Sequence, residues 1–216
     1  MILIIKLIIS YLLGSVSGSI LVGKFKGVDI RKMGSGNAGG TNAFRTMGTQ
    51  FALTVLFIDV LKGFIAVQFV SNLSLDGLLT CSNINSDILS IICGCGAVLG
   101  HVYPIYHGFK GGKGAGTMVG VLGALVPMYL IFILPIWLVV LFFSGYVGLS
   151  TMIAGIALPI CTHSFYPTGI YSPFGFFSVM VSVFIIYTHR NNIRRMLDGN
   201  ENRFKKIMLL RKKSDK

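Results

Sequence analysis

Three short polar clusters interrupt a mostly apolar chain, and the first of them is rich in glycine. It covers residues 34–45 and contains four glycines, two asparagines and one arginine. Glycine lets backbone N–H groups approach an anion closely. The side chains that would add further donors are Ser35, Asn37, Thr41, Asn42 and Arg45. A flexible turn is the alternative interpretation, but this composition exceeds what a turn needs, and we expect a phosphate-binding loop.

The second cluster covers residues 100–117 and places a lysine among glycines. Its candidate ligand-binding residues are Gly111, Gly112, Lys113, Gly114 and Thr117. The segment leads directly into an apolar run, so a helix beginning there would offer its N–H groups and its positive dipole end to an anion. The spacing differs from the Walker loop of ATPases and GTPases, because His107 stands where that motif needs glycine. We therefore expect a second anion site and no nucleotide requirement.

The third cluster starts where the last apolar segment ends and covers residues 189–201. His189, Asn192 and Arg195 follow one another at intervals of three, so a helix would present all three on one face. We expect a functional role for His189 and Asn192. For Arg190 and Arg194, a role in membrane topology is the simpler interpretation.

Two more charged residues, Asp59 and Lys62, lie three positions apart inside an apolar segment. Charge within lipid is costly and tends to be paired or functional. We expect a buried ion pair that supports the site, and direct contact with substrate is the alternative.

The segments that must position these clusters are apolar. Hydrophobic residues make up 53% of the chain and charged residues 12%, with a mean hydropathy of +0.76, which exceeds what one water-soluble core buries. Residues 114–189 form a 76-residue run without Asp, Glu, Lys or Arg, and at about 20 residues per crossing it fits four helices. Three further crossings are expected at residues 2–22, 51–70 and 88–106. We predict an all-α, polytopic integral membrane protein with seven transmembrane helices, as a single domain over residues 1–216 with a basic tail from about residue 190.

Charge predicts the orientation. The net charge is +12, and Lys and Arg are enriched in cytoplasmic loops. Residues 24–45 are basic, and the tail from residue 190 holds ten of the 19 basic residues, so both are expected inside. The connection over residues 71–87 has two aspartates and no Lys or Arg, as expected outside. With seven crossings the N-terminus lies outside, the C-terminus is cytoplasmic, and all three clusters face the cytoplasm.

Two other features of the chain suggest no additional site. The first apolar segment lacks an Ala-x-Ala cleavage pattern, and we expect it to be retained as a helix. The four cysteines have neither the spacing of a zinc site nor that of a disulfide framework, so we expect them to pack among the helices.

Together the three clusters resemble the motifs of a known family, the bacterial acyl-phosphate-dependent glycerol-3-phosphate acyltransferases, or PlsY family. The first motif is matched throughout residues 34–45. The second is matched at Gly100, His101, Pro104, Phe109, Gly111, Gly112, Lys113 and Thr117, with Gly116 where alanine is usual. The third is matched at His189, Asn192, Ile193, Arg195, Gly199 and Glu201, with Met196 in place of leucine. The resemblance extends over nearly the whole chain.

The resemblance implies transfer of a fatty acyl group from acyl phosphate to the 1-hydroxyl of glycerol 3-phosphate, which gives lysophosphatidic acid and inorganic phosphate in phospholipid biosynthesis. The catalytic residues it implies are Ser35, Lys113, His189 and His101. The substrate-binding residues it implies are Asn37, Thr41, Asn42, Arg45, Gly111, Gly112, Gly114, Thr117, Asn192, Arg195 and Glu201. The expected location is the inner (cytoplasmic) membrane, with the active site facing the cytoplasm.

A division of labour follows as a hypothesis. The residues expected to hold glycerol 3-phosphate are Arg45, Ser35, Lys113, His189 and Asn192, and the backbone of residues 111–114 with Thr117 would cradle the acyl phosphate. The other partners implied are membrane lipid and, as a further candidate, a soluble enzyme that supplies acyl phosphate. No metal or cofactor is expected, because the sequence shows neither a metal-site spacing nor a Walker loop. No nucleic acid is expected, because the positive charge follows the loops instead of forming one folded face.

Four open questions and alternatives accompany this hypothesis. The proton of the acceptor hydroxyl could pass to His189, to His101 or to the acceptor's own phosphate. Ser35 is a less attractive acyl-enzyme nucleophile, because its flanking residues do not form the nucleophile elbow of hydrolases. A transporter for a phosphorylated solute would use similar loops but would place its site near the membrane midplane between repeated halves. A scaffold that binds anionic lipid through its tail is the third possible function.

Overall fold

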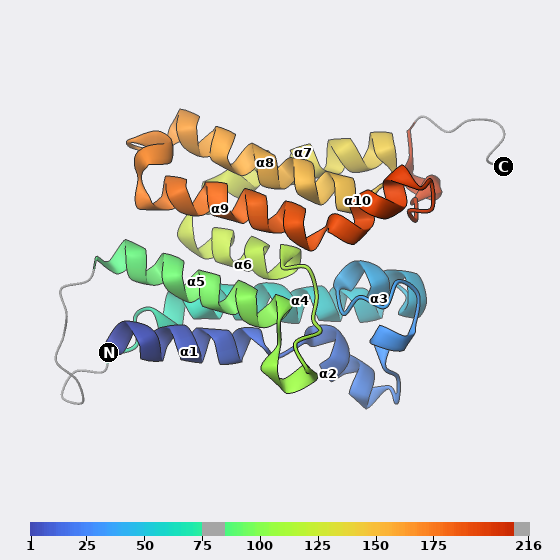
Figure 1. Cartoon of the computed structure of the whole chain (residues 1–216), viewed down its shortest axis with the longest axis horizontal. Coiled ribbons are helices and arrows are strands. Elements are labelled where there is room, and N and C mark those ends of the chain that lie inside the picture. The colour runs from blue at the N-terminus through green and yellow to red at the C-terminus, as the bar shows by residue number, and fades with distance from the viewer. Residues whose placement is uncertain (75–84, 210–216) are drawn as a thin grey trace. The chain divides into compact units, whose positions relative to one another are not determined.

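The structure is a computed structural model that describes residues 1–74 and 85–209, and within these ranges it contains helices and loops but no β-strand (Figure 1). The all-α prediction is confirmed for these residues. The chain divides into two compact units, Met1–Pro127 and Met128–Lys216. A single domain over residues 1–216 therefore stays a prediction. Asp76 and Cys81 lie outside the described residues, and Cys93, Cys95 and Cys161 are free thiols.

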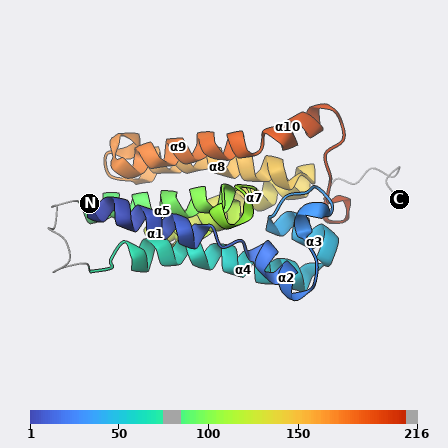
Figure 2. The same ribbon diagram turned by 60° about the horizontal axis from the view of Figure 1, so that its bottom comes forward.

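The first unit is built from paired helices. Its elements are α1 (Ile2–Gly14), α2 (Gly18–Phe25), η1 (Ile30–Lys32), α3 (Gly40–Met47), α4 (Thr49–Ile65), the π-helical turn η2 (Ala66–Val70), α5 (Ser86–Val102), η3 (Ile105–His107) and α6 (Ala115–Leu125). Helix α1 packs along α5, as both views show (Figures 1 and 2), and α4 packs along α6. This pairing brings the end of α1 to the end of α5, where the second cluster begins.

Several of these helices are suited to cross a membrane. The described helical spans that are long and apolar enough are Thr49–Val70, Ser86–His107, Pro127–Ser144 and Val147–Phe165. Helices α1 and α2 qualify together as a bent pair, and α6 and α9 (Pro173–Thr188) are shorter apolar helices. Each apolar segment predicted from the sequence is thus helical, while four or five have the length of a full crossing. Seven crossings and the orientation of the termini stay predictions.

The first apolar segment differs from the single crossing expected over residues 2–22. It is broken at residues 15–17, and its two helices are bent by 42°. Ser15 Oγ donates to the carbonyl oxygen of Tyr11 one turn back (2.9 Å), a bond that competes with the regular helix pattern. Ser17 then adopts an extended conformation and precedes α2. The break leaves the Val16 carbonyl and the Gly18 N–H available to side chains from other helices.

Glycines let the paired helices of the first unit approach closely. A Cβ added at Gly120 of α6 would overlap the carbonyl oxygen of Val60 in α4, and one added at Gly14 of α1 would overlap that of Ala97 in α5. In a membrane, association of helices depends on such close van der Waals packing, because lipid removes the hydrophobic driving force. These two glycines therefore determine how near the elements that carry the loops come to one another.

The second unit consists of α7 (Pro127–Ser144), α8 (Val147–Phe165), η4 (Gly169–Tyr171), α9, α10 (Arg190–Leu197) and η5 (Lys205–Ile207). Helices α8 and α9 pack side by side. Ser172 caps α9, since its Oγ accepts a hydrogen bond from the Gly175 N–H (2.8 Å). Helix α10 follows α9 with a change of direction (Figure 2). The chain then returns to the α7–α8 turn, where the Phe204 N–H donates to the Gly145 carbonyl (2.8 Å).

Gly120→Ala is expected to destabilise the protein by about 1–3 kcal/mol, because the new methyl group must displace the backbone of α4. The thermal unfolding midpoint of the purified protein in detergent measures the effect. Gly155→Ala in α8 is the matched control, since an added Cβ there makes ordinary contact with Ile185 at 3.4 Å. That control should be neutral or stabilising by about 1 kcal/mol through helix propensity. Equal midpoints for Gly120→Ala and the unmodified protein would contradict the close α4–α6 contact.

Candidate active site

Asn42 organises the first loop. The residue is buried, at 2% exposure, in the first turn of α3, and its Oδ1 accepts a hydrogen bond from the Ser35 N–H (2.9 Å). Its Nδ2 donates to the carbonyl oxygens of Ile30 (3.1 Å) and Met33 (2.9 Å). Both the Nδ2 group and the Oδ1 atom of the Asn42 side chain thus form hydrogen bonds with the backbone of the loop region. This geometry favours a positioning role for Asn42 over the substrate contact expected from the sequence.

Glycine conformation shapes the same loop. Gly34 and Gly36 have φ values of +55° and +72°, in the left-handed region that side chains with a Cβ rarely adopt. Ser35, between them, is exposed, and Asn37 is half-buried. The loop therefore keeps the Ser35 side chain at the surface while its backbone N–H is held by Asn42.

Arg31 joins the first loop region to the second. Its Nε and Nη2 donate to the carboxylate of Asp29 (both 3.0 Å), and its Nη1 donates to the carbonyl oxygen of His107 (3.3 Å). The hydrogen bonds from Arg31 hold the pKa of Asp29 below its usual value, so this pair is ionised at neutral pH. Residues 76 positions apart in the chain are thus linked directly. The first unit therefore brings the two glycine-rich clusters to the same end of its helices.

The second loop folds back on the end of α5. The Gly111 N–H donates to the Val102 carbonyl (3.2 Å), and the Gly112 N–H donates to the His101 carbonyl (3.1 Å). Gly114, with φ of +91°, then starts α6. The two backbone bonds hold residues 111 and 112 beside His101 and place the N-terminus of α6 directly after Lys113.

The N-terminus of α6 has features of an anion site. Its N-cap, Gly114, supplies no side-chain hydrogen bond to the first turn. Thr117 is fully buried in that turn, and within residues 1–74 and 85–209 its Oγ1 has no hydrogen-bond partner. A buried hydroxyl without a partner is uncommon and points to a ligand or water. Lys113 is half-buried just before the helix, so a positive charge accompanies the helix dipole.

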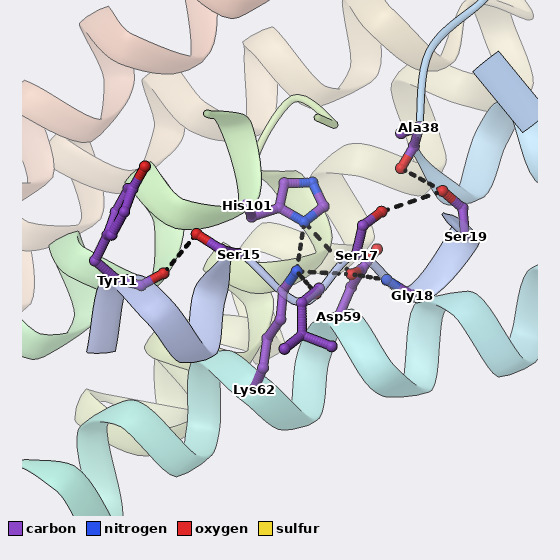
Figure 3. Close-up of polar contacts among 10 residues, drawn as sticks. Tyr11, Ser15, Ser17, Gly18, Ser19, Ala38, Asp59, Lys62 and His101 are labelled. Atoms are coloured by element: carbon purple, nitrogen blue, oxygen red, sulfur yellow. Dashed lines mark hydrogen bonds and ion pairs between the residues drawn. The ribbon is translucent and has the colours of Figure 1, made fainter. Parts of the chain in front are cut away.

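A buried charge cluster lies between the helices that carry both loops (Figure 3). Lys62 Nζ is 3.0 Å from Asp59 Oδ1 and 2.9 Å from His101 Nδ1, and it donates to the carbonyl oxygen of Val16 (2.8 Å). All three side chains are 3–4% exposed. The predicted buried ion pair is confirmed, and the structure adds His101 to it. The cluster binds α4 to α5 and to the break between α1 and α2.

The same cluster reaches the first loop through α2. The Gly18 N–H donates to Asp59 Oδ1 (3.4 Å). One residue later, Ser19 Oγ donates to the carbonyl oxygen of Ala38 in the first cluster (2.9 Å), as Figure 3 shows. Asp59 and Ser19 therefore fix the start of α2 on one side and the glycine-rich loop on the other.

His101 lies against the second loop. Its ring packs on Gly112 so closely that a Cβ added there would overlap Nε2. Tyr11 Oη donates to the carbonyl oxygen of Tyr103 (2.7 Å), which holds the chain after His101 against α1. His101 thus packs directly against the second loop at Gly112. It was expected from the sequence as a catalytic residue, and its burial and contacts indicate how it is held in place.

In the second unit, Glu201 binds two residues of the third cluster. Asn192 Nδ2 donates to Glu201 Oε1 (3.1 Å), and Arg195 Nε donates to Glu201 Oε2 (2.8 Å). Asn192 and Glu201 are both buried. Gly148 of α8 makes room for the amide, because a Cβ there would lie 2.9 Å from Asn192 Nδ2. The expected helical face of α10 is present, and its polar groups are organised around a carboxylate that follows the helix.

His189 lies between α9 and α10 and is buried. Its Nδ1 lies 2.8 Å from the carbonyl oxygen of Ile185. A carbonyl oxygen only accepts hydrogen bonds, so Nδ1 must carry a proton. The bond determines the orientation of the ring with respect to α9.

The sequence-predicted site residues fall into two sets. Those in the first unit are Ser35, Asn37, Thr41, Asn42, Arg45, His101, Gly111, Gly112, Lys113, Gly114 and Thr117. Those in the second unit are His189, Asn192, Arg195 and Glu201. The structure brings the first set to one end of its unit. Convergence of the two sets on one pocket stays a prediction.

Three residues that connect the loops and the charge cluster were not predicted from the sequence: Arg31, Val16 and Ser19. Each acts through a contact with a residue distant in the chain, and none belongs to a pattern with a local meaning. The one available signal was the row of alternating serines at positions 15, 17 and 19 inside an apolar segment.

Comparison with known proteins gives consistent results. The chain matches the family model described as glycerol-3-phosphate acyltransferase over residues 4–199. It is 39% identical over 227 residues to the glycerol-3-phosphate acyltransferase of Chlorobium phaeobacteroides (strain BS1), covering 94% of this chain and 97% of that protein. It is also 39% identical over 218 residues to the enzyme of the same name from Chlorobaculum tepidum, covering 91% and 94%.

Two solved structures have the same fold. Both are crystal structures of PlsY (YgiH), an integral membrane glycerol 3-phosphate acyltransferase, and each comparison covers 94% of this chain and 95% of that one. The TM-score is 0.80 at 37% identity for the glycerol 3-phosphate form and 0.78 at 36% identity for the lysophosphatidic acid form. The chain is therefore an integral membrane protein of the glycerol-3-phosphate acyltransferase family, the PlsY family.

Proposed function

We propose that this chain transfers a fatty acyl group from acyl phosphate to the 1-hydroxyl of glycerol 3-phosphate. The hydroxyl oxygen attacks the acyl carbonyl carbon, the bond from that carbon to the phosphate oxygen breaks, and inorganic phosphate leaves with the electron pair. The hydroxyl proton passes to a base, and lysophosphatidic acid is the product. The solved relatives carry the names of a glycerol 3-phosphate form and a lysophosphatidic acid form, which fit an acceptor and a product of this kind.

One observation carries the proposal. The reaction joins two phosphorylated molecules, so it needs two neighbouring anion sites. The Arg31–His107 hydrogen bond connects the segment just before the first glycine-rich loop to the second. Each loop leads into a helix and has a basic residue nearby in the chain, Arg45 in α3 and Lys113 before α6. A single phosphate-binding loop would serve a binding protein, whereas two adjacent loops suit a transfer between two bound phosphates.

Each loop has a role in this proposal. In the first unit, Arg45, Ser35 and Lys113 are proposed to hold glycerol 3-phosphate, and the motif resemblance assigns the same task to His189 and Asn192. The N-terminus of α6, from Gly111 to Thr117, cradles the phosphoryl group of the donor. Glu201 orients Asn192 and Arg195, since it accepts hydrogen bonds from both. Asn42 acts indirectly, by holding the first loop in shape.

Positioning should supply most of the acceleration. An acyl phosphate already carries a good leaving group, so activation of the donor is a small part of the task. Holding two reactants in the correct geometry is worth up to about 7–11 kcal/mol, whereas a general base contributes about 10²- to 10⁴-fold. The phosphate-binding groups together are therefore expected to contribute more to the rate than the proton acceptor.

The distribution of basic residues supports a cytoplasmic location for the site. The loops after α2 and the tail after α9 carry most of the basic residues, and such segments face the cytoplasm. Glycerol 3-phosphate is soluble and reaches the site from that side, while the acyl chain of the donor requires contact with lipid. We propose a location in the inner, or cytoplasmic, membrane with the site on its cytoplasmic face.

A direct assay separates this proposal from transport and from lipid scaffolding. Purified protein in detergent, incubated with acyl phosphate and labelled glycerol 3-phosphate, is expected to form lysophosphatidic acid and inorganic phosphate in equal amounts. A transporter would instead move labelled glycerol 3-phosphate into proteoliposomes without forming a product. Product formation from acyl-CoA but not from acyl phosphate would contradict the proposed donor.

Lys113→Ala and Arg45→Ala are each expected to lower kcat/KM by about 10²- to 10³-fold, the usual loss when one group that stabilises developing charge is removed. Lys26→Ala is the matched control, since Lys26 is an exposed lysine after α2 with the same charge and no role in the proposal. It should leave kcat/KM unchanged. Activity near that of the unmodified enzyme in both Lys113→Ala and Arg45→Ala would exclude the phosphate clamp.

Asn42→Ala is expected to loosen the first loop, because it removes one acceptor and two donated bonds from the loop backbone. Amide hydrogen exchange at Ser35 should become faster, and the KM for glycerol 3-phosphate should rise. Thr46→Ala, which removes a bond to the Asn42 carbonyl one turn along α3, is the control for a general effect on that helix. Unchanged exchange at Ser35 in Asn42→Ala would disprove the positioning role.

A further inference from the structure

The contacts of Lys62 determine which nitrogen of His101 carries the proton. An ammonium group has three N–H donors and no acceptor. Lys62 Nζ has three oxygen or nitrogen neighbours at hydrogen-bond distance: Asp59 Oδ1 at 3.0 Å, Val16 O at 2.8 Å and His101 Nδ1 at 2.9 Å. Each donor thus has one acceptor. His101 Nδ1 must then present a lone pair, and the single proton of the neutral ring is on Nε2.

The other protonation states fit these distances less well. A proton on Nδ1 could be donated to Asp59 Oδ1 at 3.4 Å, but Lys62 Nζ lies closer to Nδ1, at 2.9 Å, and one of its donors would then lose its acceptor. A doubly protonated ring would place a second positive charge 2.9 Å from the ammonium group in a site that is almost fully buried. Burial disfavours a charge and a like charge at this distance opposes it further.

The Nε2–H of His101 faces the second loop. Nε2 lies on the side of the ring opposite the cluster, against Gly112, where only a residue without a Cβ leaves room. The residue is 4% exposed, and within the described parts of the chain no protein group accepts a hydrogen bond from Nε2. This N–H donor is therefore available to a ligand or to water beside Gly112. Thr117 Oγ1, at the other end of the same loop, is also buried without a partner.

His189 has the opposite arrangement in its own unit. Its Nδ1 donates to the Ile185 carbonyl (2.8 Å), so the proton of the neutral ring is on Nδ1 and Nε2 carries the lone pair. Thr188 Oγ1 donates to the same carbonyl (3.0 Å), and this fixes the carbonyl as an acceptor. Of the two motif histidines, only His189 therefore has the lone pair of Nε2 in the neutral state.

We propose that His101 and His189 are held in opposite tautomers and have opposite tasks. His101, fixed by Lys62, donates its Nε2–H to an anion bound at residues 111–114. His189, fixed by the Ile185 carbonyl, is the histidine able to accept a proton through Nε2. That the anion is the phosphoryl group of the donor substrate rests on the proposed function, whereas the assignment of the tautomers does not.

Nitrogen NMR tests the tautomers without any enzyme assay. The chain has four histidines, so protein labelled with ¹⁵N-histidine in nanodiscs gives few imidazole signals, which His→Gln variants assign one at a time. At neutral pH, His101 is expected to show a protonated Nε2 and an unprotonated Nδ1, and His189 the reverse. Added inorganic phosphate should shift the Nε2 signal of His101 and leave His163, an exposed histidine at the far end of α8, unchanged.

Substitutions test the task of His101. Glutamine places an amide N–H near the position of Nε2, so His101→Gln should retain most of the activity, whereas His101→Leu should lower kcat/KM for acyl phosphate by about 10- to 100-fold, the loss expected for one hydrogen bond to a charged group. The loss should lie mainly in the KM for acyl phosphate and not in the KM for glycerol 3-phosphate. His163→Gln is the control and should be fully active.

These experiments distinguish the assignment of the tautomers and the anion site from the proposed acyl-transfer reaction. A proton on Nδ1 of His101, or a loss in His101→Gln as large as in His101→Leu, overturns the donor role. A His101 signal that does not respond to inorganic phosphate removes the anion from this site. If the tautomers and the phosphate response are as assigned but no acyl transfer occurs, the anion site stands and the proposed reaction is wrong.

Discussion

The buried ammonium group of Lys62 is the constraint on which the first unit depends. A charge inside a membrane protein is tolerated only when it is paired and hydrogen-bonded, because its desolvation is otherwise too costly. Lys62 meets this condition with one carboxylate, one imidazole and one carbonyl oxygen, taken from its own helix, from α5 and from the break between α1 and α2. Loss of any one of these leaves a buried charge or a buried polar atom incompletely bonded.

The break in the first apolar segment has its explanation in the same cluster. Backbone that leaves the helical pattern at membrane depth needs other partners for its N–H and carbonyl groups. The Val16 carbonyl is bound by Lys62 and the Gly18 N–H by Asp59. The ion pair and the broken helix therefore stabilise each other. Because α2 also binds the first loop through Ser19 and Ala38, the position of that loop is tied to the charge cluster.

The two glycine-rich clusters use their glycines for different purposes. In the first, Gly34 and Gly36 supply left-handed turns around Ser35. In the second, Gly112 gives space for an imidazole ring, and Gly114 is the N-cap of a helix whose first turn receives no side-chain cap. Each cluster combines glycines with a basic residue, Arg45 or Lys113. This is the arrangement that phosphate binding requires, and it agrees with membership in a family of enzymes that act on a phosphorylated acceptor.

The sequence alone determined the local properties of this protein. Apolar runs of sufficient length predicted the helices, the three-residue spacing of Asp59 and Lys62 predicted an ion pair on one helix face, and the composition of residues 34–45 and 111–117 predicted anion chemistry. Each depends on residues close together in the chain. The sequence also indicated the family, because each of the three motifs is an uninterrupted stretch of the chain and can be recognised without the structure.

Only the tertiary structure decided the rest. The contact of Arg31 with His107, the addition of His101 to the ion pair and the bond between Glu201 and Asn192 join groups whose positions depend on how the helices pack. The break at residues 15–17 is stabilised by side chains of α4, and within the first segment only the alternating serines gave a signal of it. The tautomer of a histidine depends on its neighbours in space and not on its neighbours in sequence, and for this reason the motifs named two histidines while the structure distinguished a donor from an acceptor.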